Sequence, residues 1–170
     1  MQKRYWLLPL VALIVGSFAA PAQAQEIWAG YDYFFEKENY ADWTLEENQD
    51  RITDIVWITR ADQMGIFNIH NEDSYIDFES PSDTEWAMGT TDDYDTLDYV
   101  TWVEWTGFNP PGTVGQNAVV HLITDDIYID IRFESWQSGG QGGGFSYYRG
   151  TPDAVATDET SWGKVKALFR

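Results

Sequence analysis

Hydrophobic and polar residues alternate over several short runs of this chain, and turn-forming residues separate the runs. A period of two is typical of half-buried β-strands. The pattern predicts strands at residues 54–60, 66–69, 85–88 and 97–106. Residues 45–49 and 161–169 have the spacing of short helices. The stretches 109–112 and 138–144 are rich in Pro and Gly and predict a sharp break and a flexible loop. We therefore expect an all-β fold, an antiparallel β-sandwich of the jelly-roll kind, with a short C-terminal helix.

The strongest β-signal lies in residues 118–136, where two β-prone runs flank Asp125 and Asp126. Two residues between the runs favour a tight hairpin in which His121 pairs with Asp130, and the alternation then separates two faces. One face is apolar, and we expect it in the core: Val120, Leu122, Ile127, Ile129, Ile131 and Phe133. The other face is polar, aromatic and charged, and it is the best candidate for a ligand-binding site: His121, Tyr128, Asp130, Arg132, Glu134 and Trp136.

This second face supports more than one function. His121 opposite Asp130, with Tyr128 beside it, could act as an oriented base in a carbohydrate-active enzyme, a polysaccharide lyase or a glycoside hydrolase. The simpler interpretation is a cross-strand His–Asp pair that only stabilises an exposed sheet. We therefore expect a non-catalytic module that binds a glycan or a cell-surface polymer, with no catalytic residue assigned. A structural or assembly domain without a small ligand is the third alternative.

Four closely spaced aspartates form a candidate metal site: Asp92, Asp93, Asp95 and Asp98. Carboxylate oxygens are the ligands that Ca²⁺ prefers, but this spacing lacks the glycine and the terminal glutamate of an EF-hand. A solvated turn without calcium is the alternative. Zinc is a weaker candidate, since His70 and His121 are the only histidines of the chain.

The N-terminus has the features of a cleavable secretory signal. Lys3 and Arg4 precede an apolar run that ends at the small residues Ala22 and Ala24, which suit a signal peptidase. The run is shorter than the ~20 residues that span a bilayer, so we expect no membrane span after cleavage. These features predict a signal peptide at residues 1–24, a secreted β-domain at 25–160 and a helical tail at 161–170. The protein would then be extracellular or periplasmic.

The charge of the chain argues against several partners. The sequence has 28 acidic and 10 basic residues, a net charge of −18, and the loss of Lys3 and Arg4 with the signal would make it −20. Nucleic acid is disfavoured because its binding depends on Lys and Arg that neutralise phosphates. Anionic membranes and, less strictly, polyanionic sugars are disfavoured as well. The chain has no cysteine, so an exported domain has to rely on its aromatic core instead of disulfides.

Six segments carry motifs with a resemblance to other proteins, among them Val-Trp-Ile-Thr-Arg at 56–60 and Ser-Pro-Ser-Asp-Thr-Glu-Trp-Ala at 80–87. The other four are residues 48–54, 65–68, 121–130 and 144–147. Together they resemble an uncharacterised group of β-rich domains in secreted bacterial proteins, over roughly residues 45–152. The resemblance implies an exported β-domain, and it carries over no activity and no catalytic residue.

Overall fold

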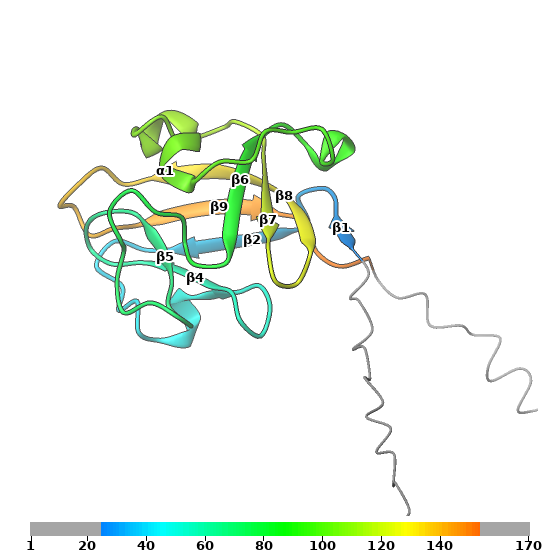
Figure 1. Cartoon of the computed structure of the whole chain (residues 1–170). Helices are drawn as coiled ribbons and strands as arrows, with labels where there is room; N and C mark the ends of the chain where they lie inside the picture. The colour runs from blue at the N-terminus through cyan, green and yellow to red at the C-terminus, as the bar shows by residue number, and fades with distance from the viewer. Residues whose placement is uncertain (1–24, 154–170) are drawn as a thin grey trace, which may run out of the picture.

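The protein is described by a computed structural model over residues 25–153, and two β-sheets with short helical turns make up this part (Figure 1). The strands are β1 (Glu26–Trp28), β2 (Tyr33–Lys37), β3 (Asp50–Arg51), β4 (Trp57–Arg60), β5 (Ile66–Asn68), β6 (Thr84–Met88), β7 (Ala118–Leu122), β8 (Ile127–Trp136) and β9 (Phe145–Arg149). The helical turns are η1 (Glu46–Asn48), η2 (Thr91–Asp93), α1 (Trp102–Trp105) and η3 (Pro110–Thr113). The predicted signal peptide and the predicted helix at 161–169 lie outside the described residues.

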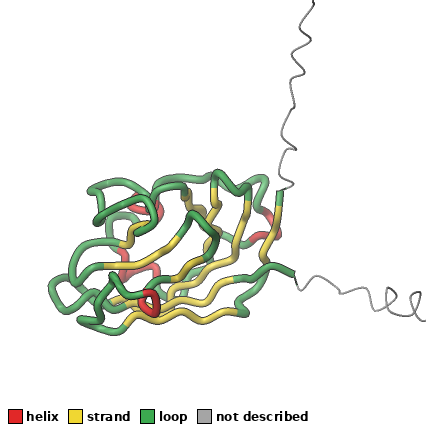
Figure 2. Tube along the Cα trace, turned by 90° about the horizontal axis from the view of Figure 1, so that it is seen from below, coloured by secondary structure: helices red, strands yellow, loops and turns green. Residues whose placement is uncertain are grey.

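The larger sheet has six strands and is mostly antiparallel. Its order is β2–β9–β8–β7–β6, and β1 pairs in parallel with the first residues of β8. Four consecutive strands, β6 to β9, are neighbours in chain order and form a meander, whereas a jelly roll requires the crossed order of Greek keys. The smaller sheet has the order β3–β4–β5. Figure 2 shows the strands running side by side and the helical turns lying among the loops. The expected mostly-β, two-sheet architecture is confirmed, and the jelly-roll order is not found.

The hairpin of β7 and β8 confirms the two predicted faces but not the predicted register. Leu122 pairs with Ile127, and His121 pairs with Tyr128 instead of Asp130. The connection has four residues, because Ile123 and Thr124 belong to the turn. Each predicted pair is therefore displaced by two residues, and an even displacement leaves every side chain on its face. The apolar face is buried as expected, with all of its residues at most 5% exposed.

Three of the predicted strands form with small changes at their ends, as β4, β5 and β6. The strand predicted at 97–106 is wrong. Val100 makes only an isolated bridge with Trp86, and the next residues form α1. A capping box starts this helix: the Glu104 N–H donates to Thr101 Oγ1, and the Thr101 N–H donates to Glu104 Oε2. The residues that alternate over 97–105 therefore form an isolated bridge at Val100 and the single turn of α1, and no strand.

One hydrophobic core joins the two sheets, and it contains Ile58 and Ile66 of the smaller sheet with Phe133 and Phe145 of the larger. A charged group also bridges the sheets inside this core. Asp50 of β3, only 1% exposed, accepts hydrogen bonds from three donors of β9. These are Tyr147 Oη at 2.6 Å, Arg149 Nε at 2.7 Å and Arg149 Nη2 at 2.8 Å. The carboxylate thereby holds β3 against β9 at a defined position.

Candidate functional site

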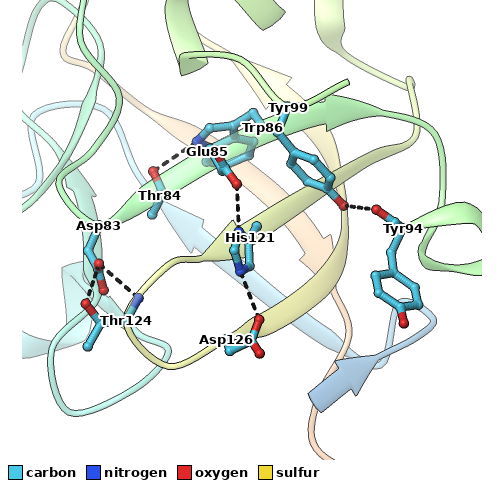
Figure 3. Close-up of polar contacts among 9 residues, drawn as sticks. All are labelled: Asp83, Thr84, Glu85, Trp86, Tyr94, Tyr99, His121, Thr124 and Asp126. Atoms are coloured by element: carbon cyan, nitrogen blue, oxygen red, sulfur yellow. Dashed lines mark hydrogen bonds and ion pairs between the residues drawn. The ribbon is translucent and has the colours of Figure 1, made fainter. Parts of the chain in front are cut away.

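A loop covers the part of the predicted face that holds His121 and Tyr128, and Figure 3 shows Tyr99 of this loop beside His121. The His121 and Tyr128 rings stack in parallel, with their centroids 4.0 Å apart. Tyr99, from the loop before α1, packs edge-on against both rings, and Tyr94 packs against Tyr128. His121 is consequently only 8% exposed. The segment that carries Tyr94 and Tyr99 therefore occupies the space in front of His121 and Tyr128, where a ligand of these two residues would have to lie.

Both ring nitrogens of His121 lie against carboxylates. Nδ1 is 2.8 Å from Oε1 of Glu85, and Nε2 is 3.4 Å from Oδ1 of Asp126 (Figure 3). Each ring nitrogen therefore already has a carboxylate partner within the protein. A general base needs a nitrogen that faces the substrate, and these contacts disfavour that role for His121. Burial raises the pKa of Tyr99 well above its ordinary value, and the neighbouring Tyr128 raises it further, so a phenolate base is disfavoured too.

Asp130 has contacts that tie loops to the sheet. Its Oδ2 accepts from the Gly30 N–H at 2.8 Å, and its Oδ1 accepts from the Thr91 N–H at 2.7 Å. Its neighbour across the hairpin is Val119 and not His121. Asp130 is only 6% exposed. The carboxylate therefore holds the β1–β2 connection and the start of η2 in place, and its oxygens are occupied.

Arg132 and Glu134 lie further along the same face and pair with each other. Arg132 Nε donates to Glu134 Oε1 at 2.7 Å, and the guanidinium lies 4.7 Å from the ring centroid of Tyr31. Both side chains are about one third exposed, at 34% and 35%. Ion pairs of this kind contribute at most about 1 kcal/mol to stability. This end of the face is an ordinary charged surface.

The four aspartates of the candidate calcium site lie on exposed turns at and after η2. Over residues 25–153, no group of three or more His, Asp or Glu side chains is arranged to hold a metal ion. The structure therefore does not gather these aspartates into a coordination shell: Asp92, Asp93, Asp95 and Asp98.

A depression of about 500 Å³ adjoins the covered face beside Glu85 and Tyr99. Tyr99 is the only aromatic residue among those that line it. Four carboxylates line it as well, and three of them are already hydrogen bonded within the protein: Asp83 to Thr124, Glu85 to His121, and Glu104 to Thr101. This acidic depression therefore offers no broad aromatic surface.

A β-bulge moves Trp136 to the opposite side of the sheet. Phe133 pairs with Tyr147 but Ser135 pairs with Ser146, so Glu134 is an extra residue in β8. Such an insertion exchanges the two faces for the residues that follow. The ring of Trp136 accordingly packs on the core side, against Phe133, Phe145 and Trp102. Trp136 therefore does not share a face with the other predicted site residues.

Trp136 and Trp102 line a groove at this end of the molecule. Its larger part has a volume of about 330 Å³, and Arg60, Tyr75 and Asp77 line it together with the two tryptophans. A smaller part of about 140 Å³ shares Tyr75, Asp77 and Trp102 with it and extends to two phenylalanines, Phe78 and Phe108. We call the two parts together the tryptophan groove. Trp102 is buried at its base, whereas Trp136 and Tyr75 are half-buried.

The rim of the tryptophan groove combines exposed apolar side chains with unusual backbone. Phe78 and Phe108 are 69% and 67% exposed, with φ angles of +68° and +61°. Met64, which also lines the groove, has a φ of +69° and is 56% exposed. A non-glycine residue in this left-handed region costs about 1–2 kcal/mol. Exposed apolar side chains on strained backbone make this rim a candidate contact surface for a ligand.

Arg60 lines the larger part of the groove. It stacks on Trp136, with its Cζ 3.9 Å from the ring centroid. Nε donates to the carbonyl of Met64 at 2.8 Å, and Nη1 donates to those of Gln137 and Gly144 at 3.0 and 3.2 Å. The side chain is only 2% exposed, and burial lowers the pKa of Arg60 to about 10. A rigid, partly desolvated guanidinium therefore lies against the aromatic ring of Trp136.

Sequence reasoning missed most of this groove, although one signal was present. Trp102 was assigned to a strand, but Thr101 and Glu104 have the spacing of a capping box, which predicts a helix start. Arg60 and Tyr75 carried no local signal, since each joins the groove only through packing. Of the predicted ligand-binding residues, the groove contains Trp136 alone.

Comparisons with known proteins return no match: no family model, no curated protein and no solved structure is similar to this chain. The resemblance to domains of secreted bacterial proteins therefore stays a prediction. In the part of the chain that the structure describes, no helix has the length and hydropathy needed to cross a bilayer.

Proposed function

We propose that this protein is a non-catalytic binding domain for an extracellular glycan, and that the tryptophan groove is its binding site. The observation that carries the proposal is the half-buried pair Trp136 and Tyr75 beside polar groups in one concave site. Sugar rings present apolar faces that pack on aromatic rings and hydroxyl edges that need hydrogen-bond partners. Asp77 and Ser138 supply such partners in the same groove.

The position of the groove supports this proposal. Trp136 ends β8, whereas β1 pairs with the first residues of that strand. A strand of ten residues is about 30 Å long, so the groove and β1 lie at opposite ends of the sheet. Both ends of the described chain lie near β1 (Figure 1). Two sheets packed over one core, as in a β-sandwich, would then present the groove away from the ends of the domain.

The carbohydrate-active enzyme is the weaker alternative. It relied on His121 as a base oriented by Asp130, but these two residues do not pair. Both nitrogens of His121 face carboxylates, and both oxygens of Asp130 accept backbone hydrogen bonds. These contacts favour a structural role for the face that holds His121 and Asp130. Export to the cell exterior stays part of the proposal.

A glycan array, scored for both binding and product release, tests the proposal. On a glycan that binds, Trp136→Ala should weaken affinity by about fivefold, because one aromatic contact is worth on the order of 1 kcal/mol. Tyr128→Ala is the matched control, since it removes a ring from the opposite face of the same strand. Trp136→Phe replaces Trp136→Ala in this affinity comparison if the alanine variant is unstable. Absence of binding to any glycan would refute the proposal, and turnover that disappears in His121→Ala would favour the enzyme instead.

A further inference from the structure

Arg60 differs from the other described arginines in its partners. Arg51, Arg132 and Arg149 each pair with a carboxylate, at 3.0, 2.7 and 2.7 Å. Over residues 25–153, Arg60 forms no ion pair and donates only to backbone carbonyls, and its Nη2 has no acceptor. Carboxylates are not scarce, because acidic residues outnumber basic ones by 28 to 10. The groove has therefore left this one guanidinium without an acidic partner.

A buried cation without a carboxylate is costly, and a ligand with a negative group would offset that cost. A second buried cation lies nearby: Lys37 is 1% exposed. Burial lowers the pKa of Lys37, and Arg60 lowers it further against the opposite effect of Asp62. Lys37 lines a different depression, so the cation that a ligand in the tryptophan groove would meet is Arg60.

The polar groups of the tryptophan groove differ between its two parts. Arg60 lines only the larger part, whereas the exposed residue Asp77 lines both. Among the described residues these two side chains form no ion pair with each other. A ligand in the groove would meet a hydrogen-bond donor with positive charge at one end and an acceptor for hydroxyl groups nearer the other. Tyr75 and Trp136 line the larger part with Arg60.

We infer that the glycan recognised by the tryptophan groove contains a uronic acid residue, whose carboxylate pairs with the Nη2 edge of Arg60. This inference rests on the proposed function of the groove. Guanidinium–carboxylate hydrogen bonds are short and strong, and their fixed geometry gives specificity. The negative net charge of the protein opposes a densely charged polymer, so a single uronic acid among neutral sugars fits this site better.

The ligand-side experiment compares each acid with its own neutral ester. The probes are oligosaccharides that contain one glucuronic or galacturonic acid residue, their methyl esters, and the corresponding neutral hexose compounds. Binding is followed by tryptophan fluorescence and by calorimetry, because Trp102 and Trp136 line the groove. The acid should bind at least about tenfold more tightly than its methyl ester. Equal affinity for acid and ester would overturn the inference and leave glycan binding intact, whereas failure of all three probes and of the glycan array would overturn both.

The protein-side experiment uses Arg60→Lys with Arg132→Lys as its matched control. Lysine keeps the positive charge but lacks the planar fork, so Arg60→Lys should reduce the preference for acid over ester by severalfold or more. Arg132 belongs to a surface ion pair on the opposite face, and its variant should keep the full preference. A preference that survives in folded Arg60→Lys would overturn the assignment. If that variant does not fold, the acid–ester comparison on the parent protein decides. Tighter binding of a free peptide C-terminus than of any uronic acid would also overturn it.

Discussion

Phe108 tests whether an exposed ring on strained backbone serves the tryptophan groove. Phe108→Gly removes the ring and the strain together. Relief of the left-handed backbone, with its φ of +61°, favours the variant by about 1–2 kcal/mol. Greater freedom of the unfolded chain costs about 0.4–1 kcal/mol, and loss of a ring that is already 67% exposed costs about 0.5–1 kcal/mol. These contributions nearly cancel, so we expect the free energy of unfolding to change by less than about 1 kcal/mol.

Phe108→Ala is the matched variant, because it removes the same ring but keeps a Cβ on the strained backbone. We expect it to be less stable than Phe108→Gly by roughly 0.5–1 kcal/mol. Urea unfolding followed by tryptophan fluorescence measures both. At a position with ordinary backbone the order would be reversed, since alanine is then favoured over glycine. An alanine variant more stable than the glycine variant would therefore refute the strain argument.

The same pair of variants separates stability from binding. Both lack the ring, so both should bind the glycan severalfold more weakly than the parent, although their stabilities differ. Unchanged affinity in both would remove Phe108 from the binding site. Full affinity in the glycine variant alone would assign the effect to the backbone instead of the ring.

Three further predictions concern the buried polar groups. Asp50→Ala leaves the Arg149 guanidinium buried without its partner and should cost about 3–5 kcal/mol in urea unfolding, and a cost below about 1 kcal/mol would contradict the structure. Asp130→Ala should lower the free energy of unfolding by about 1–3 kcal/mol and speed hydrogen exchange at the amides of Gly30 and Thr91. Unchanged exchange at these two amides would contradict the role of Asp130 in holding the two loops. Burial raises the pKa of Tyr147 well above 10, so its contribution to stability is complete below about pH 10 and is lost as the pH rises further. Stability should fall less steeply above about pH 10 in Tyr147→Phe than in the parent, and identical slopes would exclude this residue as the cause.

The pattern of the chain by itself determined the β-rich class and the two faces of the β7–β8 hairpin. The side of the sheet on which each side chain lies depends only on the period of two along a strand, and this period does not require any tertiary contact. The register was not determined in this way, because it depends on how many residues the turn takes, and Ile123 and Thr124 belong to the turn. The shift by two residues preserved the buried face, so the prediction of the core survived an error in pairing.

Tertiary structure decided where the candidate site lies. The bulge at Glu134 carried Trp136 to the core side, and nothing in the local alternation of β8 announces that extra residue. The groove then forms from Arg60, Tyr75 and Trp102, which come from β4, a long loop and α1. These side chains meet because two sheets and their loops pack around one core, and such contacts between distant segments leave no periodicity in the sequence. The loop that carries Tyr99 covers the His121 and Tyr128 part of the predicted face, since an aromatic cluster there removes more apolar area from water than an open sheet would.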